Sequence, residues 1–304
     1  MHLPFVDVII PHLNDRERLA ICLDLLERQT YPRDRYRVLV VDNGSDIPID
    51  DVVARFPLAS AASEAERGCG SARNRGAALT TGDILAFTDS DCRPEPDWIA
   101  NGVRHLRSGR GVDIVGGEIR VFCADEAHPT DAELLDKTFG FEQRRYVCRK
   151  HFSAGANIMV SREVFATVGP FRNGAFPEDL EWGRRAWAKG FRIGFAPDVL
   201  VRHPARRTWN ELKGKADRTA WHSWNYLGEK AWPRMRWALY TCGMALPPLW
   251  KCAHLLTTPV LAKGDHRRRA IATLFRVRYY RAGVMLGYLL NRAGPARAKI
   301  RPLP

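Results

Sequence analysis

Short runs of apolar residues alternate with helical patterns along the first 90 positions of the chain. Three of these runs are mostly apolar and predict buried strands at residues 6–11, 36–41 and 83–88. Between the first two, apolar residues recur at the spacing of one helix face: Leu19, Cys22, Leu23 and Leu26. Continuous rather than alternating hydrophobicity is typical of parallel strands with both faces covered. The pattern therefore predicts an α/β fold with a mostly parallel mixed sheet between helices.

The middle of the chain continues this alternation with longer irregular stretches. Further strands are predicted at residues 113–122, 191–196 and 199–203, and a small-residue loop runs into another at 153–160. Helices are predicted at about residues 70–79 and from Glu178 to Gly190. At the first helix, Asn14 and Glu17 have the three-residue spacing of a capping box. We expect residues 1–205 to form one domain and residues 206–304 to form a second, helical region.

Polar residues stand where the predicted strands end. Asn14 and Asp42 follow the first two apolar runs, and Asp89-Ser90-Asp91 directly follows the third. Ligands of parallel sheets bind at the carboxyl ends of the strands, so the functional site is expected at this edge. Two carboxylates one residue apart can share Mg²⁺ or Mn²⁺, which prefer oxygen ligands. A solvated acidic turn is the alternative interpretation of Asp89 and Asp91.

Three other groups are candidates for a function, and two of them also have a structural interpretation. The helix macrodipole explains acidic residues at a helix start, but Glu178 or Asp179 could also act as a general base. Arg73 lies in a Gly-rich stretch entering a helix, which suits a diphosphate. The glycines there match neither the dinucleotide-binding nor the P-loop spacing. His203 ends a predicted strand and is either a ligand or an ordinary strand-end residue.

Positive charge is concentrated in the last third of the chain. Residues 204–304 contain 20 Lys or Arg and 4 Asp or Glu, a net charge of +16, whereas the whole chain has +13. Six of the 9 Trp lie there as well. Such a tail implies an anionic partner, either nucleic acid or an anionic membrane surface.

An apolar stretch at residues 237–262 is long enough to span a bilayer, for which about 20 residues suffice. However, Pro247, Pro248 and Lys251 interrupt it. The basic residues that follow, beginning with 267–269, are mixed with aromatic ones, which favours a helix lying at the membrane interface. A spanning segment and a soluble packing helix remain alternatives. The N-terminus lacks signal-peptide features, and the 7 cysteines show no disulfide or zinc pattern, so we expect a cytoplasmic protein at the inner face of the membrane.

Seven motifs, taken in order, resemble those of family 2 glycosyltransferases with the GT-A fold. They are Val8-Ile9-Ile10-Pro11, Val40-Val41-Asp42-Asn43-Gly44-Ser45, Ala72-Arg73-Asn74-Arg75-Gly76, Phe87-Thr88-Asp89-Ser90-Asp91, Gly155-Ala156-Asn157, Pro177-Glu178-Asp179 and Val201-Arg202-His203. The resemblance covers about residues 4–205. It implies a Rossmann-like nucleotide-binding domain, followed here by a helical, basic, membrane-associating extension.

The resemblance also implies a role for each motif. Pro11 and Asn14 would line the nucleotide site, Asp42 would bind the nucleobase and Arg73 would lie near the diphosphate. Asp89 and Asp91 would bind the metal, with His203 assisting. Gly155 and Ala156 would form a loop beside donor and acceptor. Asp179, paired with Glu178, would be the catalytic base.

The implied activity is an inverting, hexosyltransferase-like transfer that depends on Mg²⁺ or Mn²⁺. The donor would be a UDP-, GDP- or dTDP-sugar, and the acceptor a hydroxyl of a lipid-linked or envelope glycan. No Gln-x-x-Arg-Trp signature of processive synthases is present, which favours one sugar per encounter. A sugar-nucleotide nucleotidyltransferase would normally have a Gly-rich loop after the first strand, which is absent here. A nucleic-acid-binding protein would explain the tail but not the acidic strand ends, so we expect no nucleic-acid partner.

Overall fold

The computed structural model describes residues 3–109, 111–174, 176–228 and 232–290. The chain divides into two compact units, which we call unit 1 and unit 2. Unit 1 contains Met1–Arg120 and Glu142–His203, and unit 2 contains Val121–Phe141 and Pro204–Pro304. The second unit therefore includes a segment, residues 121–141, that the sequence analysis placed in the first domain.

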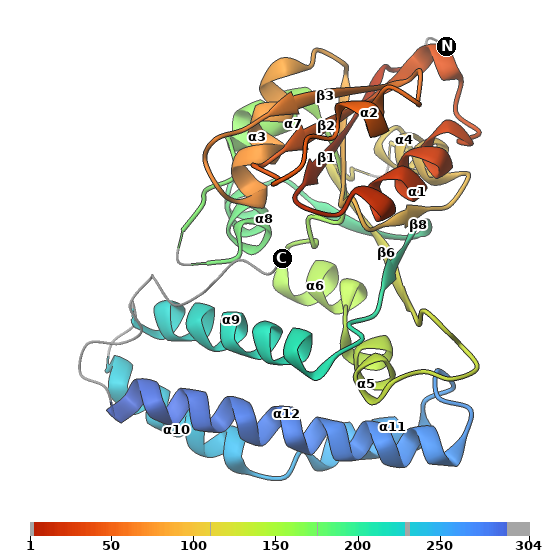
Figure 1. The fold of residues 1–304 in the computed structure, drawn as a ribbon. Helices are drawn as coiled ribbons and strands as arrows, with labels where there is room; N and C mark the ends of the chain where they lie inside the picture. Colours follow the sequence, from red (N-terminus) through yellow and green to blue (C-terminus); the bar gives the residue numbers. More distant parts are fainter. Residues whose placement is uncertain (1–2, 110, 175, 229–231, 291–304) are drawn as a thin grey trace. The chain divides into compact units, whose positions relative to one another are not determined.

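An eight-stranded mixed sheet has the strand order β3-β2-β1-β4-β7-β6-β8-β5 (Figure 1). The strands are β1 (Val6–His12), β2 (Tyr36–Asp42), β3 (Ala59–Ser63), β4 (Ile84–Thr88), β5 (Arg93–Pro94), β6 (Ile114–Phe122), β7 (Asn157–Ser161) and β8 (Ile193–Pro204). The first four are parallel neighbours, whereas β7 pairs antiparallel with both β4 and β6. The predicted α/β fold with a mixed sheet is confirmed.

The helices of unit 1 connect these strands. They are α1 (Arg16–Glu27), α2 (Asp50–Val53), α3 (Cys69–Leu79), α4 (Trp98–Leu106), α6 (Gln143–Lys150), α7 (Arg162–Val168) and α8 (Glu178–Ala188), with a 3₁₀ turn at Arg33–Arg35. Phe87, Phe171 and Trp182 pack together in the core between the sheet and α8. A Cβ atom at Gly76 would lie 2.4 Å from Ile9 Cγ2, so glycine is what allows α3 to approach β1 so closely.

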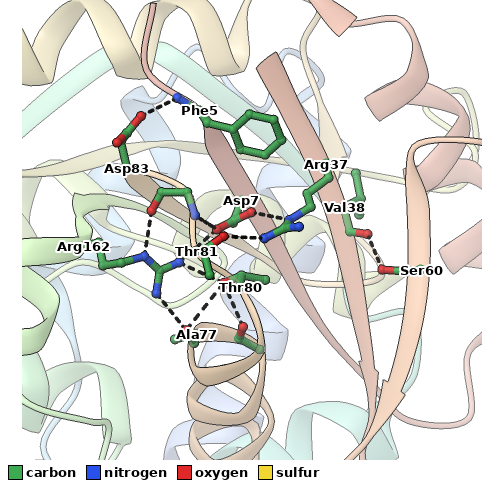
Figure 2. A network of polar contacts seen from close by, with 12 residues as sticks. Phe5, Asp7, Arg37, Val38, Ser60, Ala77, Thr80, Thr81, Asp83 and Arg162 are labelled. Atoms are coloured by element: carbon green, nitrogen blue, oxygen red, sulfur yellow. Dashed lines mark hydrogen bonds and ion pairs between the residues drawn. The ribbon is translucent and has the colours of Figure 1, made fainter. Parts of the chain in front are cut away.

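Asp7, which is fully buried in β1, is the centre of a polar network at the amino-terminal side of the sheet (Figure 2). It accepts hydrogen bonds from Arg37 Nε at 2.7 Å, Arg162 Nη2 at 2.9 Å and the backbone N–H of Gly82 at 2.6 Å. Arg162 also donates to the carbonyl of Ala77 at the end of α3. A buried carboxylate is tolerated only when it is paired and hydrogen-bonded in this way. The network joins β1 to the end of α3, and both elements lead to the opposite edge of the sheet, where the strands β1, β2 and β4 end.

Two local predictions were wrong. Asp15, not Asn14, caps α1, because its side chain accepts from the backbone N–H of Arg18 while Asn14 adopts a left-handed φ of 54°. The two predicted strands around Pro197 form the single strand β8. Pro197 has no backbone N–H to donate to a neighbouring strand. Asp198 anchors the strand instead, because its Oδ1 lies 2.7 Å from His105 Nε2 and its backbone carbonyl accepts a hydrogen bond from Asn101 Nδ2 at 2.7 Å.

Unit 2 is helical. Its elements are α5 (Asp131–Phe139), α9 (Trp209–Gly228), α10 (Pro233–Ala245), α11 (Leu249–Thr257) and α12 (Gly264–Leu290). The long helix α12 packs against the other four. Leu134 of α5 shares a core cluster with Leu212, Leu255 and Leu274, which explains why residues 121–141 belong to this unit.

The apolar stretch at 237–262 is divided between α10 and α11. The break falls at residues 246–248, where Pro247 and Pro248 interrupt the helical pattern. Within the described part of the chain, no helix is both long enough and apolar enough to cross a membrane.

Candidate active site

The carboxyl ends of β1 and β2 bring the predicted nucleotide-site residues together. Pro11 pairs with Val41 in the sheet, and Asp42 lies in the next register position, opposite His12. Asp42 accepts hydrogen bonds from the backbone and side chain of Ser45. The side chain of Asn14 in turn accepts from the backbone N–H of Asp46 at 2.8 Å. Pro11, Asn14 and Asp42 therefore lie near one another where β1 and β2 end, and their part in nucleotide binding stays a prediction.

The two carboxylates after β4 have different partners. Asp89 Oδ1 accepts from Arg73 Nη2 at 2.7 Å, whereas Asp91 Oδ2 lies 3.4 Å from His203 Nε2. The other oxygen of Asp91, Oδ1, is buried and accepts no hydrogen bond from the residues that the structure describes. Burial raises the pKa of Asp91, although His203 acts in the opposite direction. Among the described residues, no three Asp, Glu, His or Cys side chains already converge into a metal site.

Arg73 is buried in α3 and bridges two carboxylates from distant parts of the chain. Its Nη1 donates to Glu178 Oε1 at 2.8 Å, opposite its bond to Asp89. Only 3% of its side chain is exposed, so both terminal nitrogens are held in place. A Cβ atom at Gly155 would lie 2.4 Å from Arg73 Cζ, and therefore the glycine makes room for the guanidinium. The sequence placed Arg73 near a diphosphate; the bridge to Glu178 was not foreseen.

Asp179, at the start of α8, is held by backbone N–H groups. Its Oδ2 accepts from Gly155 at 3.2 Å and its Oδ1 from Leu180 at 2.7 Å. Burial, and then the charge of Glu178, raise the pKa of Asp179 to about 7, against the influence of Arg73. A carboxylate with such a pKa can accept a proton near neutral pH. The adjacent Glu178 is instead engaged by Arg73.

Gln143, which the sequence analysis missed, fixes the loop that carries Gly155 and Ala156. From α6 its Nε2 donates to Gly117 O and to Ser153 Oγ, both at 2.9 Å, and its Oε1 accepts from the backbone N–H of Ala154 at 3.1 Å. Ala156 is buried beside these groups. Since Gln143 forms part of no motif, only its long-range contacts reveal its role.

His12 is a second residue that the sequence analysis did not single out. It is buried at the end of β1, beside Asp42, and burial lowers its pKa, so its ring is neutral at pH 7. Its Nδ1 has no hydrogen-bond partner among the described residues. An unpartnered ring nitrogen beside Asp42 can bind a polar ligand group.

The sequence matches the family model described as Glycosyl transferase family 2 over residues 7–169, more than half of the chain. The chain is similar to glycosyltransferase AglE of Haloferax volcanii, with 36% identity over 69% of this chain and 70% of that protein. It is also similar to a glucosyl-dolichyl phosphate glucuronosyltransferase of the same organism, with 33% identity over 40% of this chain but only 38% of that protein.

The fold is similar to that of a solved mannosyltransferase from Pyrobaculum calidifontis, PcManGT, in complex with GDP-Man and Mn²⁺. The TM-score is 0.61 at 21% identity, covering 94% of this chain and 88% of the other. The family match and the curated relatives favour a glycosyltransferase over the two alternatives from the sequence, a sugar-nucleotide nucleotidyltransferase and a nucleic-acid-binding protein. The chain therefore belongs to glycosyl transferase family 2 and is a glycosyltransferase.

Proposed function

We propose that the chain transfers one sugar from a nucleotide-sugar donor to a hydroxyl group of a lipid-linked or envelope-glycan acceptor, with inversion at the anomeric carbon and with a divalent cation. The observation that carries this proposal is the placement of Asp179. Its carboxylate is fixed on the N–H of Gly155, and its neighbour Glu178 is linked through Arg73 to Asp89. One ion-paired chain thus connects the residue next to the proposed base with the proposed metal-binding pair.

In this mechanism Asp179 removes the proton of the acceptor hydroxyl as that oxygen attacks the anomeric carbon. The bond between the sugar and the diphosphate breaks in the same step, and the electron pair leaves with the diphosphate. A single displacement by a neutral hydroxyl needs a base but no nucleophile on the protein. Arg73 acts as a positioning residue, because its two terminal nitrogens hold the side chains of Asp89 and Glu178.

The residues at the end of β4 fit a hard cation. Asp91 Oδ1 is buried without a hydrogen-bond donor among the described residues, and a carboxylate oxygen in that position suits Mg²⁺ or Mn²⁺. Asp91 and His203, with Asp89, would hold the ion. When bound, it would stabilise the negative charge of the leaving diphosphate. The Mn²⁺ in the complex of PcManGT supports this assignment.

The nucleotide is assigned to the surface formed by Pro11, Asn14 and Asp42, with His12 beside it. Asp42 remains the proposed nucleobase ligand, as the family resemblance implies. The GDP-Man bound to PcManGT supports a nucleotide sugar as donor.

A panel of UDP-, GDP- and dTDP-sugars, each with Mn²⁺ or Mg²⁺, tests the proposed activity. We expect slow hydrolysis of one donor that EDTA abolishes and added metal restores. The same reaction with the Asp91→Asn variant should show no metal-dependent activity, since an amide is a poorer ligand for a hard cation. Activity of that variant equal to the wild type in saturating Mn²⁺ would remove Asp91 from the metal site.

Unit 2 supplies the argument for a membrane-bound acceptor. Large apolar side chains are exposed along α10, α11 and the residues next to them: Trp232, Met235, Leu239, Leu246, Leu249, Trp250 and Leu256. Soluble surfaces rarely expose so many apolar groups in one region, and Trp favours the membrane interface. We infer that this surface, which we call the α10–α11 apolar surface, attaches the protein to the inner face of the membrane.

Two of the three arginines at 267–269 have partners within unit 2. Arg269 is paired with Asp131 at 2.7 Å, and Arg267 donates to the carbonyl of Leu261 at 2.9 Å. These two residues brace unit 2 internally, whereas the side chain of Arg268 is exposed. The apolar side chains are therefore the sharper target for a test of membrane attachment.

A further inference from the structure

Helix α12 of unit 2 contains one arginine whose charge is not neutralised. Arg269 of this helix is paired with Asp131 at 2.7 Å. Arg278 donates to carbonyl groups at the C-terminal end of α10, the negative end of the helix dipole. Arg281, one turn further along α12, has neither kind of partner. Among the residues that the structure describes, no carboxylate lies within ion-pair distance of Arg281 and no carbonyl accepts from it.

The guanidinium of Arg281 is held where α9, α10 and α12 pack together (Figure 1). Its Nη2 donates to Ser223 Oγ of α9 at 3.2 Å and to Tyr240 Oη of α10 at 3.1 Å. Its Nη1 has no partner among the described residues, and its Nε is buried there without an acceptor. A guanidinium held only by neutral hydroxyl groups keeps its full charge and remains a strong donor to phosphate oxygens.

The acidic residues of these three helices are engaged elsewhere. The helices contain eleven Lys or Arg but only three Asp or Glu. Glu211 accepts from backbone N–H groups at the start of α9, and Asp217 accepts from Tyr280 Oη at 3.0 Å. Asp265 lies in the first turn of α12, far along the helix from Arg281. The missing partner of Arg281 is therefore an anion from outside the three helices.

The helices around this arginine are fixed by a buried aromatic core. Trp237 of α10 donates from Nε1 to the carbonyl of Met285 at 2.8 Å, one turn after Arg281 on α12. Trp237 and Met285 share a core cluster with Ala220 of α9. The ring of Trp224 meets that of Trp237 edge-on, with 5.0 Å between the centroids. The guanidinium is thus held in place before an anion binds, which lowers the entropic cost of binding.

The same place adjoins the α10–α11 apolar surface. Leu239, a member of that surface, directly precedes Tyr240, and the side chain of Arg278 contacts the backbone carbonyl of Leu246, another member. Tyr240 itself is 38% exposed. Its hydroxyl accepts from Arg281, and its own proton has no acceptor among the described residues, so the hydroxyl is a second available donor. Tyrosine is enriched at membrane–water interfaces.

We propose that Arg281 and Tyr240 bind the phosphate of an anionic membrane lipid, and we call these two residues the α10–α12 phosphate site. Arg281 Nη1 and the Tyr240 hydroxyl donate to the phosphate oxygens, while the acyl chains of the lipid lie along the α10–α11 apolar surface. Ser223, whose own proton goes to the carbonyl of Thr219, positions the guanidinium. This inference rests on the proposed membrane attachment and names the lipid group that unit 2 recognises.

Sedimentation of the full chain with vesicles of phosphatidylcholine and phosphatidylglycerol, and with vesicles of phosphatidylcholine alone, tests the inference. We expect tighter binding to the vesicles with phosphatidylglycerol. Arg281→Gln should weaken that binding at least tenfold. Arg281→Lys should weaken it as well, because an ammonium group lacks the planar fork that contacts the hydroxyl groups and the phosphate together.

Arg268→Gln is the matched control, since it removes the same charge from the same helix at a side chain that is 81% exposed. It should weaken binding no more than about fivefold, the effect of one charge near an anionic leaflet. Tyr240→Phe keeps the aromatic ring and removes only the hydroxyl group, and it should weaken binding at least threefold. Donor hydrolysis, measured in the same preparations, should be unchanged in all four variants.

Three results would overturn the inference. The first is an equal effect of Arg281→Gln and Arg268→Gln, and the second is wild-type binding by Arg281→Lys, because either would mean attraction by charge alone. The third is release of the bound protein by inorganic phosphate beyond the release caused by NaCl at the same ionic strength, which would mean a site for free anions. A wild-type protein that sediments with neither kind of vesicle would instead refute the proposed membrane attachment, so the two failures are distinguishable.

Discussion

Two adjacent carboxylates at the start of α8 differ in chemistry because they differ in partners. Glu178 is engaged by the guanidinium of Arg73, whereas the donors to Asp179 within the described residues are backbone N–H groups. The sequence identified the pair but gave no way to rank its members without the family resemblance. The ion chain from Asp89 through Arg73 to Glu178 could not be predicted either, since it joins residues 105 positions apart.

The acid limb of the pH profile should report the ionisation of Asp179. Burial and Glu178 raise its pKa to about 7, and only the deprotonated carboxylate accepts a proton, so kcat/KM should fall as the pH drops below about 7. Glu178→Gln removes the negative charge that helps to raise the pKa of Asp179, so the acid limb of the profile should move to lower pH. Glu181→Gln, on the same helix, should leave it in place. A wild-type profile that is flat from about pH 5 to 8 would refute this assignment.

At the scale of elements, the site depends on how closely α3 and the loop around Gly155 approach each other. Apolar patterns predicted β1, β2 and β4, which are almost wholly buried, and the helices α1, α3 and α8. They did not predict the largely exposed strand β3 or the helices α2, α4, α6 and α7. They also could not predict that α5 joins unit 2, since that follows from contacts of Leu134 with residues far along the chain. Nor could they find Gln143, whose partners lie up to 26 positions away.

Gly155→Ala should disturb the site more than the fold. The new methyl group would lie 2.4 Å from Arg73 Cζ, so the guanidinium must shift and weaken its bonds to Asp89 and Glu178. We expect transfer activity to fall at least tenfold, with a loss of about 1–3 kcal/mol in the free energy of unfolding from overpacking. Steady-state kinetics and chemical denaturation measure the two effects.

Gly174→Ala is the matched control, because no atom lies within 4 Å of its added Cβ. It should retain both activity and stability. Wild-type activity in Gly155→Ala would mean that the position of Arg73 is unimportant for transfer.

At the scale of the molecule, catalysis and attachment are assigned to different units. The net charge of residues 204–304 pointed to an anionic partner from the sequence alone. In the structure, Arg269 is paired with Asp131 within unit 2. We therefore assign membrane attachment mainly to the exposed side chains of the α10–α11 apolar surface.

Leu249→Gln combined with Trp250→Gln should weaken sedimentation with anionic vesicles at least tenfold. These side chains are 74% and 61% exposed, so their loss should not affect the stability of unit 2. Donor hydrolysis, measured in the same preparation, should be unchanged. Leu79→Gln, at an exposed apolar position of unit 1, is the control and should sediment like the wild type. If the wild-type protein does not sediment with anionic vesicles, the α10–α11 apolar surface has another partner.

The account depends most on Asp179 as the base of sugar transfer, and one comparison tests it directly. Donor affinity and single-turnover transfer rate should be measured for the wild type and for Asp179→Asn. The amide keeps the shape of the side chain but cannot take a proton, so we predict nearly normal donor binding and a rate lowered by about 10²–10⁴-fold. A collapse of donor affinity with unchanged turnover of bound donor would contradict the account, and would make Asp179 a binding residue and Glu178 the base.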